Sequence, residues 1–180
     1  SGKNTTITRK DPLYPFVKIK DNFSVTADFE EKNFKYWTYD WRISFDKSSK
    51  YEGWDSKGYR KRFFKVAGSF FPNENIKISS DFRVKKEKEW LNWLDGNHLA
   101  AYDLNQRIFS INLDWFRGAK HEIRFKSQFV ALEAKNPRSL SADLGGFLSA
   151  SEKIVKSFSN GITSFQIRYK YEIAPLSNIY

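Results

Sequence analysis

Two tryptophans and several polar side chains lie close together near the middle of the chain. In the segment EWLNWLDGN, the indoles of Trp90 and Trp93 are interleaved with amide and carboxylate groups. Indole rings present a flat apolar face together with a polar N–H, which suits stacking on a sugar ring and hydrogen bonding to its hydroxyls. The alternative is that the indoles anchor the segment at a membrane interface or pack it against its surroundings. The candidate ligand-binding loop consists of Trp54, Trp90, Asn92, Trp93 and Asp95.

Catalytic and metal-binding chemistry have less support in this sequence. The two histidines, His98 and His121, have no histidine or serine two positions away, and the chain has no cysteine. Neither histidine has a partner at metal-ligand spacing. Asp95 with His98 is the remaining enzymatic alternative, a hydrolytic pair at the rim of a barrel. We therefore expect no catalytic residue, no metal and no cofactor.

The elements that must position these residues are indicated by strict alternation. From Phe165 to Ile173 every odd position is large and apolar and every even position is polar, which is the pattern of a strand with one apolar and one polar face. The same alternation marks further strands, whereas residues 1–16 are expected to form a loop, and Ile179-Tyr180 to begin one more strand. The clearest alternation in the further strands covers residues 17–30, 37–46, 64–70, 76–85, 109–115 and 122–129, and the shorter of these strands are expected to extend a few residues beyond it.

Connections between these strands alternate in length. About three to five residues join the first strand to the second, the third to the fourth and the fifth to the sixth, and about 13, 15 and 27 residues fill the other gaps. Short turns at one end of a sheet and long loops at the other are typical of an outer-membrane β-barrel. A chain of 180 residues is also expected to form a single domain.

Strand length favours a membrane barrel over a soluble fold. The expected strands run to about 10–13 residues, near the roughly 9–11 of a tilted membrane-spanning strand and longer than the five or six of most soluble strands. The fold expected is all-β, a portion of an antiparallel up-and-down transmembrane β-barrel. The alternative is a soluble antiparallel sandwich or barrel that binds carbohydrate or nucleic acid.

The polar face of the expected barrel would line its lumen. That face carries both signs of charge, so most of the net charge of +10 lies in loops, turns and strand ends. We expect either a wet lumen that contacts a polar solute, with a weak bias toward anions, or a lattice of cross-strand ion pairs. The lumen-facing residues expected are Lys18, Lys20, Asp28, Glu30, Asp40, Arg42, Lys77, Asp81, Arg83, Lys85, Asp114, Glu122, Arg124, Lys126, Arg168, Lys170 and Glu172.

Nucleic acid is a less favoured partner for this basic, aromatic-rich chain. Single-stranded nucleic acid is bound where stacking aromatics and cations share one surface. The alternation in this chain places them on opposite faces. Basic residues such as Lys57, Arg60, Lys61 and Arg62 either form a solvated run of charge, which is the commoner case, or pair with anionic lipid headgroups.

Four segments of the chain also resemble a known family. The stretches WRISFDKSSKYEGWDS, KKEKEWLNWL, KHEIRFKSQFVALEAKNP and TSFQIRYKYEIAPLSNIY are similar to the C-terminal region of a Gram-negative family of outer-membrane proteins of unknown function. Its members pair an N-terminal module similar to family 9 carbohydrate-binding domains with a barrel-like C-terminal domain.

The resemblance implies a location and partners. It places the chain in the outer membrane, in contact with membrane lipid and lipopolysaccharide, as part of a pore, a transporter or a surface glycan-binding protein. It also implies that this chain is the C-terminal part of a larger barrel completed by the rest of its own polypeptide. It carries over no catalytic residue.

Overall fold

Every regular element among the described residues is a β-strand. The computed structural model describes residues 5–8, 16–19, 22–31, 34–48, 51, 53–54, 58–118, 120–172 and 178–179. No helix in this part of the chain is long and apolar enough to cross a membrane. The strands are β1 (Thr5–Thr8), β2 (Phe16–Ile19), β3 (Asn22–Glu31), β4 (Trp37–Ser48), β5 (Arg60–Asn73), β6 (Ile76–Trp93), β7 (His98–Arg117), β8 (His121–Ala142), β9 (Leu148–Ala150), β10 (Phe158–Glu172) and β11 (Asn178–Ile179).

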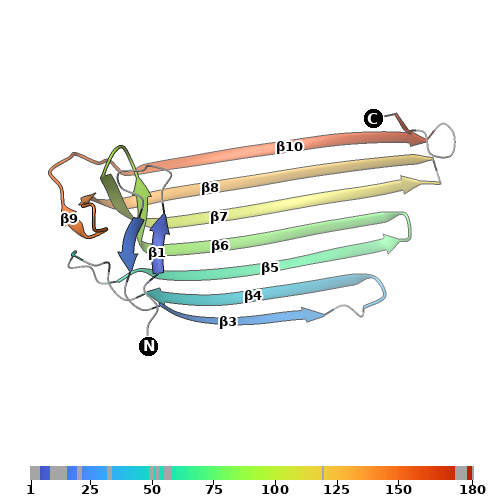
Figure 1. The fold of residues 1–180 in the computed structure, drawn as a ribbon. Helices are drawn as coiled ribbons and strands as arrows, with labels where there is room; N and C mark the ends of the chain where they lie inside the picture. Colours follow the sequence, from blue (N-terminus) through green and yellow to red (C-terminus); the bar gives the residue numbers. More distant parts are fainter. Residues whose placement is uncertain are drawn as a thin grey trace.

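One antiparallel sheet contains most of these strands. Its order is β11-β10-β8-β7-β6-β5-β4-β3, with β9 paired to the far end of β8, and β1 pairs with β2 in a separate two-stranded sheet (Figure 1). Long neighbouring strands follow one another in the chain, as an up-and-down connection requires. The all-β, antiparallel class expected from the alternation is confirmed.

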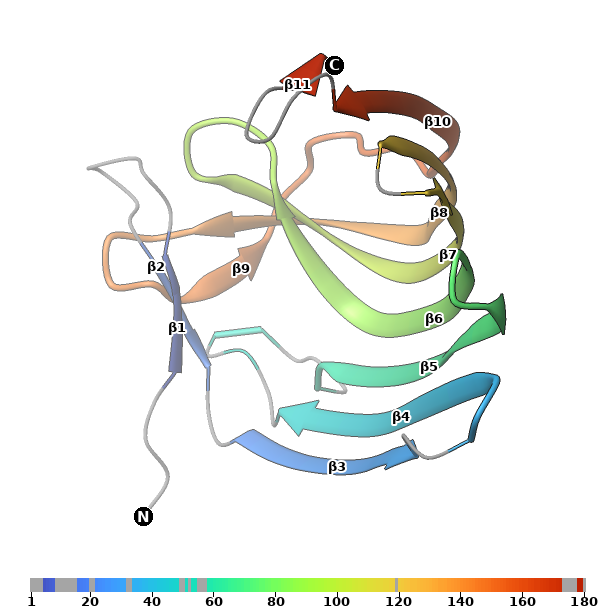
Figure 2. The same cartoon turned by 90° about the vertical axis from the view of Figure 1, so that its right-hand side faces the viewer.

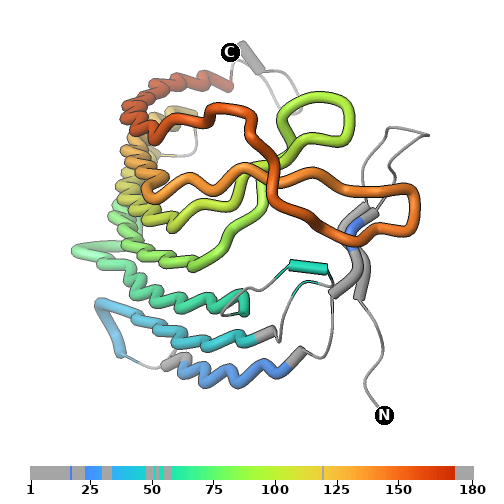
Figure 3. The backbone as a smooth tube through the Cα atoms, turned by 90° about the vertical axis from the view of Figure 1, so that its left-hand side faces the viewer, coloured from blue at the N-terminus to red at the C-terminus, as the bar shows by residue number. Residues whose placement is uncertain are grey.

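The large sheet curls into a half-barrel. Seen along the strands, β3 to β10 follow an arc, and its two edges, at β3 and at β10–β11, lie apart (Figures 2 and 3). A right-handed twist between neighbouring strands makes such a sheet coil when its strands are long. The half-barrel therefore has a concave face, a convex face and two open edges.

The seven expected strands and the short stub are all present, but their ends differ from the expectation. β2 does not continue into β3, because Phe16–Ile19 pairs with Thr5–Thr8, a strand within the range expected to be a loop. β6, β7 and β8 contain 18, 20 and 22 residues, well beyond the expected 10–13. As a result only residues 94–97 connect β6 to β7, where a long loop was expected.

The extra length of β6 to β8 is stabilised by two small cores, one on each side of the strands. Leu99, Leu140 and Leu148 are fully buried in one of them, which Val17 of β2 completes. Tyr102 and Leu104 belong to the other. Side chains are thus buried on both faces here, so the strands lose their alternating pattern.

Candidate functional site

On the central strands of the sheet, the exposure of the two faces is the reverse of that in a soluble β-protein, whereas β3 and most of β10 are exposed on both faces. On β5, Phe64, Val66 and Phe70 are 41%, 40% and 49% exposed. The polar Lys65 between them has a side chain only 26% exposed. Side chains on the inside of a curl shield one another, so the polar face is the concave one. The apolar side chains therefore cover the convex face.

Ion pairs run across the concave face. Asp28 lies directly opposite Arg42 on the neighbouring strand, and their side chains approach to 2.6 Å. Both are about half exposed, so this pair contributes little stability by itself. Further pairs on this face are Asp40–Lys65 (2.5 Å), Asp46–Lys61 (3.0 Å), Asp81–Arg83 (2.8 Å), Glu87–Lys85 (3.2 Å), Asp114–Arg124 (3.7 Å) and Glu122–Arg124.

A polar hollow of about 500 Å³ lies on the concave face of β6, β7, β8 and β10. The amide of Gln128 donates a hydrogen bond to the hydroxyl of Ser110 at 3.3 Å within it. The hollow combines hydroxyls, amides and charges of both signs, which suits contact with a polar solute. Its polar lining is Asp81, Arg83, Ser110, Asn112, Lys126, Gln128, Ser164 and Gln166.

Polar lining does not extend over the whole concave face. Ile108, Val130 and Ile162 lie side by side in one row of β7, β8 and β10 on that face. Farther toward the long-loop end, Leu132 and Val155 pack against the core that contains Tyr102. The polar part of the concave face is therefore nearer the short-turn end on these strands.

Most of the residues expected to face a lumen lie on the concave face. Lys18 does not, because it belongs to β2 in the separate two-stranded sheet. Lys20 and the side chain of Glu30 lie outside the described part of the chain. The residues on the concave face are Asp28, Asp40, Arg42, Lys77, Asp81, Arg83, Lys85, Asp114, Glu122, Arg124, Lys126, Arg168, Lys170 and Glu172.

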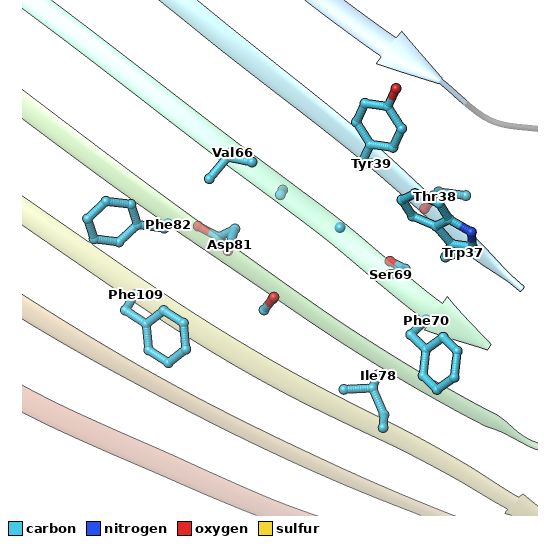
Figure 4. A pocket seen from close by; sticks show the side chains of 13 residues that line it. Trp37, Thr38, Tyr39, Val66, Ser69, Phe70, Ile78, Asp81, Phe82 and Phe109 are labelled. Carbon is cyan, nitrogen blue, oxygen red and sulfur yellow. The ribbon is translucent and has the colours of Figure 1, made fainter. Parts of the chain in front are cut away.

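The convex face contains an apolar hollow of about 630 Å³ (Figure 4). Gly68 forms part of its lining where an apolar side chain would continue the pattern of β5, and its cross-strand neighbours are Tyr39 and Ser80. A Cβ at position 68 would lie 3.1 Å from the carbonyl oxygen of Thr38. The larger side chains around it are Trp37, Val66, Phe70, Ile78, Phe82 and Phe109.

The tryptophans expected to form one sugar-binding loop lie in two separate clusters. Residues 89–93 belong to β6, so the expected loop is wrong for that segment. Trp90 packs near Tyr102, with ring centroids 6.0 Å apart, whereas Trp93 packs against the core around Leu99. Positions three apart on a strand point to opposite faces, which separates these indoles. Asn92 is also on β6, while Asp95 lies in the turn after it.

Trp54 packs against the same core as Trp93 and also lies beside Arg138. The guanidinium of Arg138 lies over the indole of Trp54, 5.4 Å from the ring centroid. It also pairs with Glu89 and Asp103, each at 3.4 Å. A hollow of about 510 Å³ opens here, bordered also by Arg60 and Lys88. The alternation did not predict this site, because Arg138 lies beyond a bulge in the pairing of β7 and β8.

Two buried glutamates lie near this site, and each accepts a hydrogen bond from a tyrosine, Glu87 through its carboxylate and Glu89 through its backbone. The hydroxyl of Tyr59 donates a hydrogen bond to Glu87 Oε1 at 2.5 Å, and that of Tyr51 donates to the carbonyl oxygen of Glu89 at 2.9 Å. Burial, followed by the bond to Glu87, raises the pKa of Tyr59 far above its ordinary value. Burial and the nearby charge of Glu89 raise the pKa of Tyr51 in the same direction.

The histidines lie at opposite ends of the sheet. His121 Nδ1 lies 2.7 Å from the hydroxyl of Tyr169 near the short turns. His98, at the start of β7, has its Nδ1 3.5 Å from the hydroxyl of Ser151. The side chain of Asp95 forms an ion pair at 2.5 Å with Lys153, which follows β9.

Among the described residues, no group of three or more histidine, aspartate or glutamate side chains is arranged so that it could hold a metal ion. No family model, curated protein or solved structure matches the chain.

Proposed function

We propose that this chain forms part of the wall of a membrane-embedded β-barrel, with its convex face in lipid and its concave face toward an aqueous lumen. The observation that carries the proposal is the reversed exposure of the central strands β5 to β7, in which large apolar side chains of the convex face are exposed and charged side chains of the concave face are half-buried. Exposing so much apolar surface to water would be unfavourable, at about 25 cal/mol for each Å². In a bilayer the same surface contacts acyl chains.

The apolar surface of the convex face also has a limited height. On β8 it extends from Ile123 to Ala131, which at about 3.4 Å per residue covers roughly 27 Å along the strand. With a tilt of about 40° the projected height is roughly 20 Å, close to the apolar band of about 25 Å on membrane barrels. Aromatic residues mark its short-turn end, among them Trp115 and Tyr169.

The open edges of the half-barrel fit this proposal if further strands complete it. An unpaired strand edge is not stable in hydrocarbon, because its backbone groups have no partner. We propose that strands from the rest of the polypeptide pair with β3 and with the β10–β11 edge. The enclosed lumen would then contain the polar hollow around Ser110 and Gln128, in a pore or transporter for a polar solute.

Single-cysteine variants can test the proposed orientation, because the chain contains no cysteine of its own. Val66 and Ala67 are adjacent residues of β5 that point to the convex and concave faces. A fluorophore at Val66→Cys should be quenched by nitroxide groups on lipid acyl chains in reconstituted bilayers. At Ala67→Cys it should respond to a water-soluble quencher instead. Equal responses at both positions, or a protein that stays dispersed without detergent, would contradict the proposal and favour a soluble antiparallel binding module.

A further inference from the structure

Cations on the two faces of the sheet have different surroundings. On the concave face, Lys61 and Lys85 pair with Asp46 and Glu87. On the convex face, six exposed cations lie at the long-loop end of the apolar surface, and none has a carboxylate of another described residue within ion-pairing distance. This basic stripe consists of Lys47, Arg60, Arg62, Lys86, Lys88 and Arg107.

The strand register gathers these cations into a compact surface. Arg62 lies directly opposite Lys86, and Arg60 lies opposite Lys88. Neighbouring strands are about 4.8 Å apart and successive residues on one face about 7 Å apart, so four long side chains can reach one or two phosphate groups. Repulsion among so many unpaired cations is relieved when an anion binds between them.

Apolar surface and a polar hollow border the basic stripe on its two sides. Phe64 and Val84 lie in the next row toward the short turns, which Arg107 of the stripe continues on β7, and acyl chains would lie against the apolar side chains of this row and beyond it. On the other side, Arg60 and Lys88 border the hollow that contains Trp54 and Asp103. Arg138 lies over the Trp54 indole and pairs with Asp103, so this hollow offers hydrogen-bond donors and acceptors to the hydroxyls of a sugar.

We infer that the basic stripe binds the phosphorylated sugar headgroup of a glycolipid, whose acyl chains lie on the convex face below. This inference rests on the proposed function. The phosphates bind the cations of β5 and β6, and the sugar enters the hollow beside Trp54. A lipid with this headgroup would occupy the leaflet on the side of the long loops.

Two double variants with the same change of charge test the inference. Arg62→Gln with Lys86→Gln removes two unpaired convex cations, whereas Lys61→Gln with Lys65→Gln removes two paired cations of the concave face. Binding of bisphosphorylated lipid A to the refolded full chain would be titrated in neutral detergent. The first variant should lose about tenfold or more in affinity and the control less than about threefold, given the strength of headgroup attraction to each cation. The wild-type affinity should also fall as salt is added.

Three results would overturn the inference while leaving the proposed function intact. These are equal losses in the two variants, equal binding of lipid A that lacks its phosphates, and equal affinity for phosphatidylglycerol, which is anionic but has no sugar. The lipid-quenching experiment on Val66→Cys is independent of headgroup binding. If that quenching is absent, the proposed function fails and the inference fails with it.

Discussion

Glu87 and Glu89 are buried carboxylates, each only 4% exposed. A buried carboxylate is stable only when charges or hydrogen-bond donors compensate for the water it loses. Lys85 and Tyr59 do so for Glu87, and Arg138 does so for Glu89. These contacts hold Tyr59 and Trp54, which precede β5, against the extended ends of β6 and β8 and so shape the hollow beside the basic stripe.

Replacing Tyr59 by phenylalanine should destabilise the protein by about 1–3 kcal/mol, because the variant removes a hydrogen bond to a buried charged group. The free energy of unfolding would be measured by urea titration with tryptophan fluorescence. Tyr36→Phe is the control, since Tyr36 is 49% exposed. Equal stability of Tyr59→Phe and the wild type would contradict the geometry of this hydrogen bond.

The raised pKa values of Tyr51 and Tyr59 also predict a dependence on pH. Both tyrosines remain neutral in the folded protein at a pH where they ionise in the unfolded chain, above their ordinary value of 10.0. Their contribution is fully present below that pH and is lost as the pH rises further, by up to about 1.4 kcal/mol per pH unit for each tyrosine. Unfolding measured from pH 8 to 11 should show a shallower decline for the Tyr51→Phe, Tyr59→Phe double variant. If the free energy of unfolding fell equally with pH in the wild type and the double variant, these tyrosines would not be the source of the pH dependence.

At the scale of the elements, alternation predicted the strands wherever one face is apolar and the other polar. It failed at the ends of β6, β7 and β8, where Leu99, Ala100, Ala101 and Tyr102 are all buried although they are consecutive. A strand covered on both sides has no period of two, so the residues there resembled loops. The prediction that Trp90 and Trp93 belong to one binding loop was wrong for the same reason. A loop would have left both indoles free to face one ligand, whereas on a strand these two positions point to opposite faces.

The segment before β5 reaches the far end of the sheet through a close approach at Gly53. Its φ is +85°, and a Cβ there would lie 2.6 Å from the carbonyl oxygen of Leu148 in β9. Gly53→Ala should therefore cost more than about 2 kcal/mol, because strain and a backbone clash combine. Gly96→Ala is the matched control, since its φ is +50° but no atom lies within 4 Å of the added Cβ. The two variants would be compared by urea unfolding, and equal losses would show that the contact with β9 is absent.

Across the whole molecule, the half-barrel divides into three zones along its strands. The short-turn end carries aromatic residues, the middle of the convex face is apolar, and the long-loop end carries the basic stripe and the two small cores. Alternation alone predicted the two faces, but this order along the strands depends on cross-strand register. Arg62 and Lys86 are far apart in the sequence, and only their pairing shows that they share a surface.

If the middle zone lies in lipid, the cost of a charge there depends on which face carries it. Ile111 and Asn112 are adjacent on β7 and point to the convex and concave faces at the same depth. Ile111→Arg should destabilise the folded protein in bilayers by about 2–4 kcal/mol, because an arginine near the bilayer midplane loses its hydration. Asn112→Arg should cost much less, since its guanidinium remains among polar groups.

The two variants would be folded in bilayers of fixed composition across a urea series, and the folded fraction would be followed by the heat-modifiable electrophoretic mobility of the folded form. Ile111 is 36% exposed, so a soluble sheet would tolerate Ile111→Arg at least as well as Asn112→Arg. If Ile111→Arg proves no less stable than Asn112→Arg, lipid contact at the centre of the convex face is excluded.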